Sequence, residues 1–148
     1  MATQLALVNG ATVIGTVSEA NRDSYRALGA VPVHYASDGL ADRIRAVAPG
    51  GIDWVLDAFG HNVLPLSIQL AGGPGGVVTV VDPTAAEYGV HLSIESFPIP
   101  EVMSEVLPLI ETGRVVLPVE ATYPLRDSAA AYRRVVTGHR TGKIIITI

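Results

Sequence analysis

Thr12-Val13-Ile14-Gly15-Thr16-Val17 is the stretch that decides the fold. It is rich in β-branched residues and ends at Ser18, where a polar stretch begins a helix that Gly29 terminates. A short strand at Val31–Tyr35 and a helix over Leu40–Val47, expected to be capped by the preceding Asp38, come next. This order of strand, helix, strand and helix predicts a parallel sheet packed against helices.

The same alternation continues through the middle of the chain. It predicts a strand at Ile52–Leu56, a helix from near Asn62, a break at Gly72–Gly76 and a strand at Val77–Val81. Together with the first elements, these predict an α/β fold whose mainly parallel, doubly wound sheet carries helices on both faces.

The last third predicts two helices and a terminal strand. The first helix opens at Pro100, and Pro108 inside it should kink or split it, because proline removes a backbone donor and clashes with the preceding turn. After an extended piece at Val116–Tyr123 we expect an Asp127-capped helix that ends at Gly138, and a final strand at Lys143–Ile148.

Composition limits the classes of function. A chain of 148 residues with 49% hydrophobic and 16% charged residues suits one compact domain, residues 1–148. The absence of cysteine excludes disulfides and thiolate chemistry. The start of the chain has no signal-like pattern, so we expect a cytoplasmic protein. A net charge of −4 with scattered basic residues predicts neither nucleic-acid nor membrane binding, which leaves small molecules and protein partners.

Three stretches, in the right order, resemble the second half of quinone-oxidoreductase-like members of the medium-chain dehydrogenase/reductase superfamily, the zinc-free relatives of alcohol dehydrogenases. They are Gly10–Ser18 continuing to Arg26–Ala30, then Gly51–Gly60, and finally Tyr123–Arg133 with Gly138–Ile145. The resemblance implies the nucleotide-binding half of such an enzyme, with a truncated Rossmann-like fold.

The resemblance also implies parts that this sequence does not show. Family members carry a GroES-like catalytic domain, then a first strand and a glycine-rich turn that cradles the cofactor pyrophosphate at a helix N-terminus. Gly72–Gly76 does not replace that turn, because it precedes a strand instead of linking a strand to a helix. A separately encoded GroES-like partner is one way in which the enzyme would be completed.

The candidate cofactor site lies beyond the second strand of the family's order. A hydroxyl at Ser18 and a guanidinium at Arg22 suit the 2′-phosphate of NADP(H) better than the ribose hydroxyl of NAD(H). By resemblance Tyr35 lines the same phosphate pocket, and Gly60 lies in the turn that passes the nicotinamide ribose. Lys143, in the Gly142-Lys143 pair, either reaches a phosphate or simply begins the last strand. The alternative is a surface cap, a solvated arginine and an edge tyrosine.

The candidate catalytic pair is Asp57 with His61, on either side of a turn at a strand's carboxyl end. A carboxylate near an imidazole could orient it and raise its pKa, which would give an acid/base pair. The alternatives are a structural role for Asp57 and helix capping by His61 or Asn62. Asp82, after the next strand, is either at the same crevice or in a turn before Pro83.

A metal site is not expected. His34, His91 and His139 lack metal-ligand spacing, and there is no cysteine. The leading hypothesis is therefore a truncated NADPH-dependent quinone or enone oxidoreductase domain. One alternative is a cofactor-independent isomerase, lyase or cyclase that uses the vacated crevice; another is a non-catalytic interaction module.

The missing first strand predicts an assembly. In the doubly wound order that strand lies between the second and fourth strands, here Thr12–Val17 and Ile52–Leu56. Either these two strands pair directly or a strand from a second chain fills the space, because buried unpaired backbone groups cost ~1–3 kcal/mol each. We expect direct pairing inside each subunit, and a homodimer joined through Lys143–Ile148.

Overall fold

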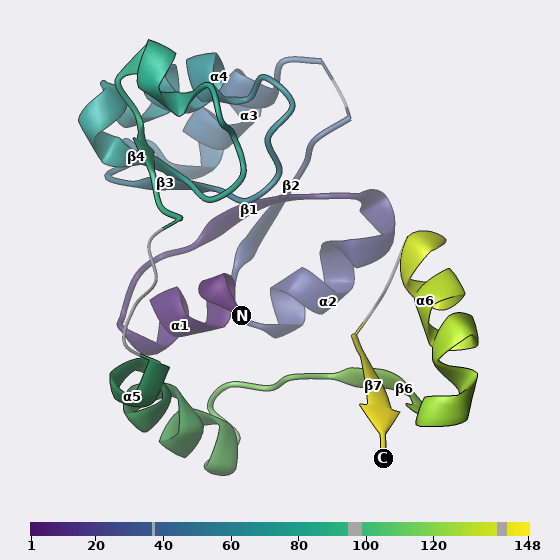
Figure 1. Ribbon diagram of the computed structural model, residues 1–148. Coiled ribbons are helices and arrows are strands. Elements are labelled where there is room, and N and C mark those ends of the chain that lie inside the picture. The colour runs from purple at the N-terminus through teal and green to yellow at the C-terminus, as the bar shows by residue number, and fades with distance from the viewer. Residues whose placement is uncertain (37, 95–98, 139–141) are drawn as a thin grey trace. The chain divides into compact units, whose positions relative to one another are not determined.

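A computed structural model describes residues 1–36, 38–94, 99–138 and 142–148 (Figure 1). His139, one of the histidines considered for a metal site, lies outside these residues. The chain divides into two compact units: unit 1 is Met1–Gly10 with Pro100–Ile148, and unit 2 is Ala11–Ile99.

Unit 2 begins with a parallel strand pair, β1 (Ile14–Val17) and β2 (Val31–His34), in which Ile14 lies opposite Val31. A 3-10 turn and helix α2 (Arg22–Ala27) connect them. A Cβ atom at Gly15 would lie 2.3 Å from the Tyr25 ring of α2, so only glycine leaves room for this ring against β1.

The second sheet of unit 2 holds three parallel strands: β3 (Val55–Asp57), β4 (Val77–Thr79) and β5 (His91–Leu92). Helix α3 (Leu40–Val47) precedes it, and α4 (Leu64–Ala71) connects β3 to β4. The buried residues of this sheet and its connections form one hydrophobic core, which consists of Leu64, Val77, Ala85 and Val90. Burial of these side chains supplies the main stabilisation of the sheet.

The expected direct pairing of the second and fourth strands is wrong. Among the described residues β1 pairs only with β2, and β3 pairs only with β4, so the two strands belong to separate sheets. Each pair consists of a strand, a helix and a second strand parallel to the first. No described strand joins the β1–β2 pair to the β3–β4 pair.

Unit 1 contains helices α1 (Ala2–Val8), α5 (Ile99–Glu111) and α6 (Ser128–Val136) and the parallel strands β6 (Val119–Pro124) and β7 (Lys143–Thr147). The side chain of Gln4 ties α1 to the segment after α5. Its Nε2 donates to Val116 O at 2.9 Å, and its Oε1 accepts from Val116 N at 2.7 Å. The side-chain amide thus pairs with the backbone as a neighbouring strand would.

Every pair of described strands is parallel, which confirms the α/β class expected from the sequence. Helix α5 runs unbroken past Pro108. The expected side-chain caps are absent: Gly39 takes the cap position of α3 in place of Asp38, and Asp127 precedes α6 without a capping hydrogen bond. None of the helices in the described ranges is long and apolar enough to cross a membrane.

Candidate functional site

The carboxyl ends of the strands of unit 2 carry the candidate groups. Ser18 follows β1 and Tyr35 follows β2. The Tyr35 N–H donates to Val17 O at 3.2 Å. The parallel pairing therefore places the backbones of Ser18 and Tyr35 at the same end of the sheet, where the strands have their carboxyl ends. This is the position that open α/β sheets use for ligands.

Arg22 and Glu19 form an ion pair at this edge. Arg22 Nη1 lies 3.2 Å from Glu19 Oε1, and the two side chains remain 41% and 67% exposed. Arg22 Nε is buried and has no hydrogen-bond partner. The guanidinium therefore keeps one donor without a hydrogen bond. Its charge is already paired with that of Glu19, which was not predicted from the sequence.

Tyr35 is 53% exposed, and its ring stacks on His34 with 5.7 Å between centroids. Arg43 binds the end of β2 and Asp38, because its Nη2 donates to His34 O at 2.7 Å and its Nη1 to Asp38 O at 2.6 Å. The Tyr35 side chain is thus exposed, and its backbone lies beside the end of β1, next to a carbonyl that Arg43 binds.

Asp57, the last residue of β3, is buried and accepts three hydrogen bonds. Its Oδ1 accepts from the N–H groups of Phe59 (2.8 Å) and Gly60 (2.9 Å), and its Oδ2 accepts from the Thr79 hydroxyl (2.8 Å). Burial raises the pKa of this carboxyl, but the three donors outweigh it and hold the pKa below its ordinary value of 3.8. Asp57 is thus kept ionised, and it fixes the turn that follows β3.

Thr79 continues this network into β4 and was not anticipated from the sequence. Its side chain is fully buried, and its Oγ1 accepts from the N–H groups of Val81 (3.2 Å) and Asp82 (3.1 Å). Asp82 in turn accepts from both the amide and the hydroxyl of Thr84, at 2.9 and 2.7 Å. This confirms the turn role for Asp82. The signal available in the sequence was a lone threonine at an inward position of an apolar strand.

The turn after β3 has an unusual backbone. Gly60, His61 and Asn62 all have positive φ, at 74°, 57° and 60°. Glycine adopts this conformation freely, whereas the other two are strained, and such strain is concentrated at functional positions. His61 is exposed, and the centroid of its ring lies 4.8 Å from the centroid of the Phe59 ring.

The oxygens of Asp57 therefore bind the turn and Thr79, while the His61 ring lies against Phe59. This geometry gives Asp57 the structural role that was the alternative to catalysis. The capping role considered for His61 and Asn62 is wrong, because α4 begins at Leu64 after Val63 and has no side-chain cap.

Lys143 lies in unit 1, where it begins β7 and its N–H donates to Pro118 O at 2.7 Å. Gly142 just before it passes so close to the chain that a Cβ atom there would lie 2.5 Å from Pro118 O. The close approach to Pro118 thus explains the glycine before Lys143 without a bound phosphate. The other candidate residues belong to unit 2.

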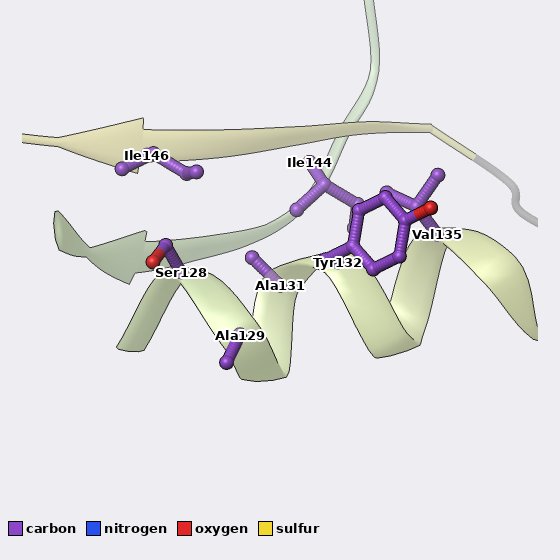
Figure 2. Close-up of a pocket in the computed structure, with 7 residues that line it drawn as sticks. All are labelled: Ser128, Ala129, Ala131, Tyr132, Val135, Ile144 and Ile146. Atoms are coloured by element: carbon purple, nitrogen blue, oxygen red, sulfur yellow. The ribbon is translucent and has the colours of Figure 1, made fainter. Parts of the chain in front are cut away.

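An open apolar groove of about 510 Å³ lies between α6 and β7 in unit 1 (Figure 2). Only Ser128 and Tyr132 bring polar side-chain atoms to its lining. The sequence predicted only a helix and a terminal strand here, and no site. The remaining lining residues are Ala129, Ala131, Val135, Ile144 and Ile146.

The chain matches a family described as zinc-binding dehydrogenase over residues 28–146. It is 31% identical over 162 residues to spectinabilin polyketide synthase system protein NorB of Streptomyces orinoci, with 99% of this chain and 8% of that protein covered. It is 28% identical to the 2-haloacrylate reductase of a Burkholderia species, with 93% and 48% covered.

Among solved structures, the quinone oxidoreductase of Escherichia coli complexed with NADPH superposes with a TM-score of 0.78 at 20% identity, over 99% of this chain and 52% of that one. The chain thus spans about half of the reductase and of the oxidoreductase, and a small part of the synthase.

The zinc in the family's description does not fit the residues present. The sequence holds no cysteine, and the described ranges bring together no three His, Asp or Glu side chains that could hold a metal ion.

Proposed function

Because the chain belongs to the zinc-binding dehydrogenase family, as the C-terminal, nucleotide-binding half of a medium-chain dehydrogenase/reductase, we propose that it is the cofactor-binding domain of an NADPH-dependent reductase. Its substrates would be quinones or enones, and residues 1–148 would act as one domain of zinc-free type. The substrate side of the cleft would come from a GroES-like partner on another segment or chain.

The observation that carries this proposal is the buried Nε of Arg22, which has no hydrogen-bond partner, in the segment that follows Ser18. A buried donor without a partner costs ~1–3 kcal/mol, and a turn of the part-exposed guanidinium toward an anionic oxygen would remove that cost. The residues at this edge therefore fit the adenosine 2′-phosphate of NADP(H), which Ser18, Arg22 and Tyr35 would hold. The NADPH in the quinone oxidoreductase complex agrees with this choice.

Glu19 sets a condition on this binding. Its carboxylate pairs with the same guanidinium at 3.2 Å, so a phosphate must displace it or share Arg22 with it. An acid after this strand is also the group that favours the ribose hydroxyl of NAD(H). We infer that the attraction of Arg22 for the phosphate exceeds the repulsion by Glu19 when NADP(H) is bound, because a guanidinium forms two parallel hydrogen bonds with a phosphate.

The bound cofactor would supply the hydride for reduction of an activated double bond or a quinone. The residues of this chain would position it: the edge beyond β1 and β2 would hold the adenosine end. The turn Asp57–Gly60 would present backbone atoms near the nicotinamide ribose. Asp57 would keep this turn rigid through its three hydrogen bonds and would itself move no proton.

Titration of the purified chain with NADPH and with NADH, monitored by nicotinamide fluorescence, tests the proposal. We expect saturable binding that is tighter for NADPH than for NADH, and an Arg22→Ala variant that has lost this preference. Arg45→Ala is the matched control, because Arg45 likewise pairs with an acid three residues away, Asp42 at 3.0 Å, and is not a candidate site residue. Equal affinity for the two cofactors, or an Arg22→Ala variant that binds as the wild type does, would contradict it.

A cofactor-independent isomerase, lyase or cyclase is a second candidate, favoured by one observation. His61 is exposed and strained at φ 57°, at a strand's carboxyl end. With Asp57 committed to the turn, the imidazole would act alone as acid or base. Loss of turnover in His61→Ala without loss of stability would support this candidate.

We further propose a homodimer joined through the C-terminal strands. Among the described strands β7 pairs only with β6, which leaves its other edge open, and Ile145 and Ile146 are exposed. An apolar terminal strand without proline is a ready site for pairing with a second chain.

A further inference from the structure

The Thr79 hydroxyl joins the two turns that follow β3 and β4. It donates to Asp57 Oδ2 at 2.8 Å, and it accepts from the N–H groups of Val81 and Asp82 at 3.2 and 3.1 Å. A hydroxyl has one proton to donate and two lone pairs, so these three hydrogen bonds use its whole capacity. Thr79 is also fully buried. A role of this residue in binding must therefore act through the two turns and not through direct contact with a ligand.

Asp57 extends the network from Thr79 into the first turn. Its Oδ1 accepts from the N–H groups of Phe59 and Gly60, while its Oδ2 accepts from the Thr79 hydroxyl. One carboxylate and one hydroxyl thus fix four backbone N–H groups at the carboxyl ends of two neighbouring strands. These are the N–H groups of Phe59, Gly60, Val81 and Asp82.

The two turns lie against each other. The Val80 N–H donates to Asp57 O at 3.0 Å, which continues the pairing of β3 with β4 beyond the last residue of β4. A Cβ atom at Gly60 would lie 3.5 Å from Val81 Cγ2. The turns after β3 and β4 therefore present adjacent parts of one surface, at the end of the sheet where α/β folds bind ligands.

This surface differs in charge from the segment that follows β1. Residues 58–62 and 80–81 contain no carboxylate, lysine or arginine, and Asp82 is buried. The segment after β1, by contrast, carries the ion pair of Arg22 with Glu19. A guanidinium suits a phosphate, whereas an uncharged surface suits the reduced nicotinamide ring and its ribose. The exposed side chains of the two turns are Phe59, His61, Asn62, Val80 and Val81.

We propose that Thr79 is a positioning residue that sets the affinity for the nicotinamide half of NADPH and leaves the affinity for the adenosine half unchanged. Acting directly on one turn and through Asp57 on the other, its hydroxyl holds both in the conformation that receives the ring and ribose. His61 and Asn62 have positive φ, a strained conformation that persists only where the surroundings hold it. A turn that is already fixed loses less conformational entropy on binding. The inference rests on the proposed function, because its ligand is NADPH.

Calorimetric titration with two probes tests this role: NADPH, and adenosine 2′,5′-bisphosphate, which has the 2′-phosphate but no nicotinamide. Thr79→Val removes the hydroxyl and should bind NADPH about tenfold more weakly than the wild type does, with unchanged affinity for the bisphosphate. Thr79→Ser keeps the hydroxyl and should restore NADPH binding. Thr84→Val is the matched control, because the Thr84 hydroxyl donates to Asp82 at 2.7 Å and not to Asp57 or Thr79, so both probes should bind as they do to the wild type.

A folded Thr79→Val variant that binds NADPH as the wild type does, or that loses affinity equally for both probes, would overturn the proposal. Because Thr79→Val could also fail to fold, hydrogen exchange in the wild-type chain is the deciding measurement. NADPH should slow exchange at the four N–H groups that Asp57 and Thr79 fix, and the bisphosphate should not. An equal response to the two probes would overturn the role of Thr79 alone, whereas a wild type that binds neither probe would overturn the proposed function as well.

Discussion

Replacement of Asp57 by asparagine should destabilise the protein far more than its near-identical shape suggests. The asparagine side chain can still accept from Phe59 and Gly60, but it presents NH₂ where Oδ2 met the Thr79 hydroxyl. The Thr79 oxygen already accepts from Val81 and Asp82, so it has no lone pair left for a new donor.

The Thr79 hydroxyl and the new amide are then two donors without an acceptor in a buried site. The Thr79 hydroxyl is fully buried, and the new amide faces it. Each buried unsatisfied donor costs ~1–3 kcal/mol, and part of that cost is relieved by small shifts. We expect a loss of about 2–4 kcal/mol in the free energy of unfolding, a large share of the stability of a domain of this size.

Urea denaturation monitored by circular dichroism measures this loss. The matched control is Asp53→Asn, two residues before β3, because Asp53 is exposed and should change stability by less than about 0.5 kcal/mol. In the double variant Asp57→Asn with Thr79→Val, the two losses should not add, since the residues share one hydrogen bond. An Asp57→Asn variant as stable as the Asp53→Asn control would refute this reasoning.

Four further predictions follow from the same geometry. Because the pKa of Asp57 in the folded protein lies below 3.8, the stabilisation by its carboxylate is complete above about pH 3.8 and is lost as the pH falls toward the folded pKa. The difference in urea midpoint between wild type and Asp57→Asn should therefore shrink below pH 3.8. A difference that stays constant would contradict this. Glu19→Gln should tighten NADPH binding, because it removes the acid that competes for Arg22; unchanged or weaker binding in the fluorescence titration would show that Glu19 does not compete. His61→Ala should alter the free energy of unfolding by less than about 0.5 kcal/mol, since the ring is exposed; a larger loss in denaturation would assign the imidazole a packing role. Light scattering should find a dimer at micromolar concentration, and a monomer would remove the proposal of pairing through β7.

The order and type of the main elements could be predicted because each depends on local signals. The β-branched run that became β1 and the breaker before β4 appear directly in the sequence. The side-chain caps were wrong because capping depends on loop geometry: Gly39 with φ 70° takes the place expected for Asp38. The direct pairing of β1 and β3 was wrong because strand order is a long-range property that no local pattern encodes.

The candidate site was predicted only in outline. Its position at the carboxyl ends of parallel strands follows from the fold class, and Ser18 and Tyr35 do lie at one sheet edge. The partners of each group could not be read from the sequence. Thr79 lies 22 residues from Asp57 and meets it only through the pairing of β3 with β4. Glu19 was overlooked because an i,i+3 ion pair forms only once the backbone turns there.

The most direct test of the account is the fluorescence titration of the 148-residue chain with NADPH and NADH, carried out on wild type and Arg22→Ala in parallel. Loss of the charge-assisted phosphate contact should weaken binding roughly ten- to hundredfold, from ~1.5–3 kcal/mol. The account predicts that wild type binds NADPH more tightly than NADH by about this factor, and that Arg22→Ala abolishes the difference. Equal binding of the two cofactors by the wild type, or a preference that survives in Arg22→Ala, would contradict it.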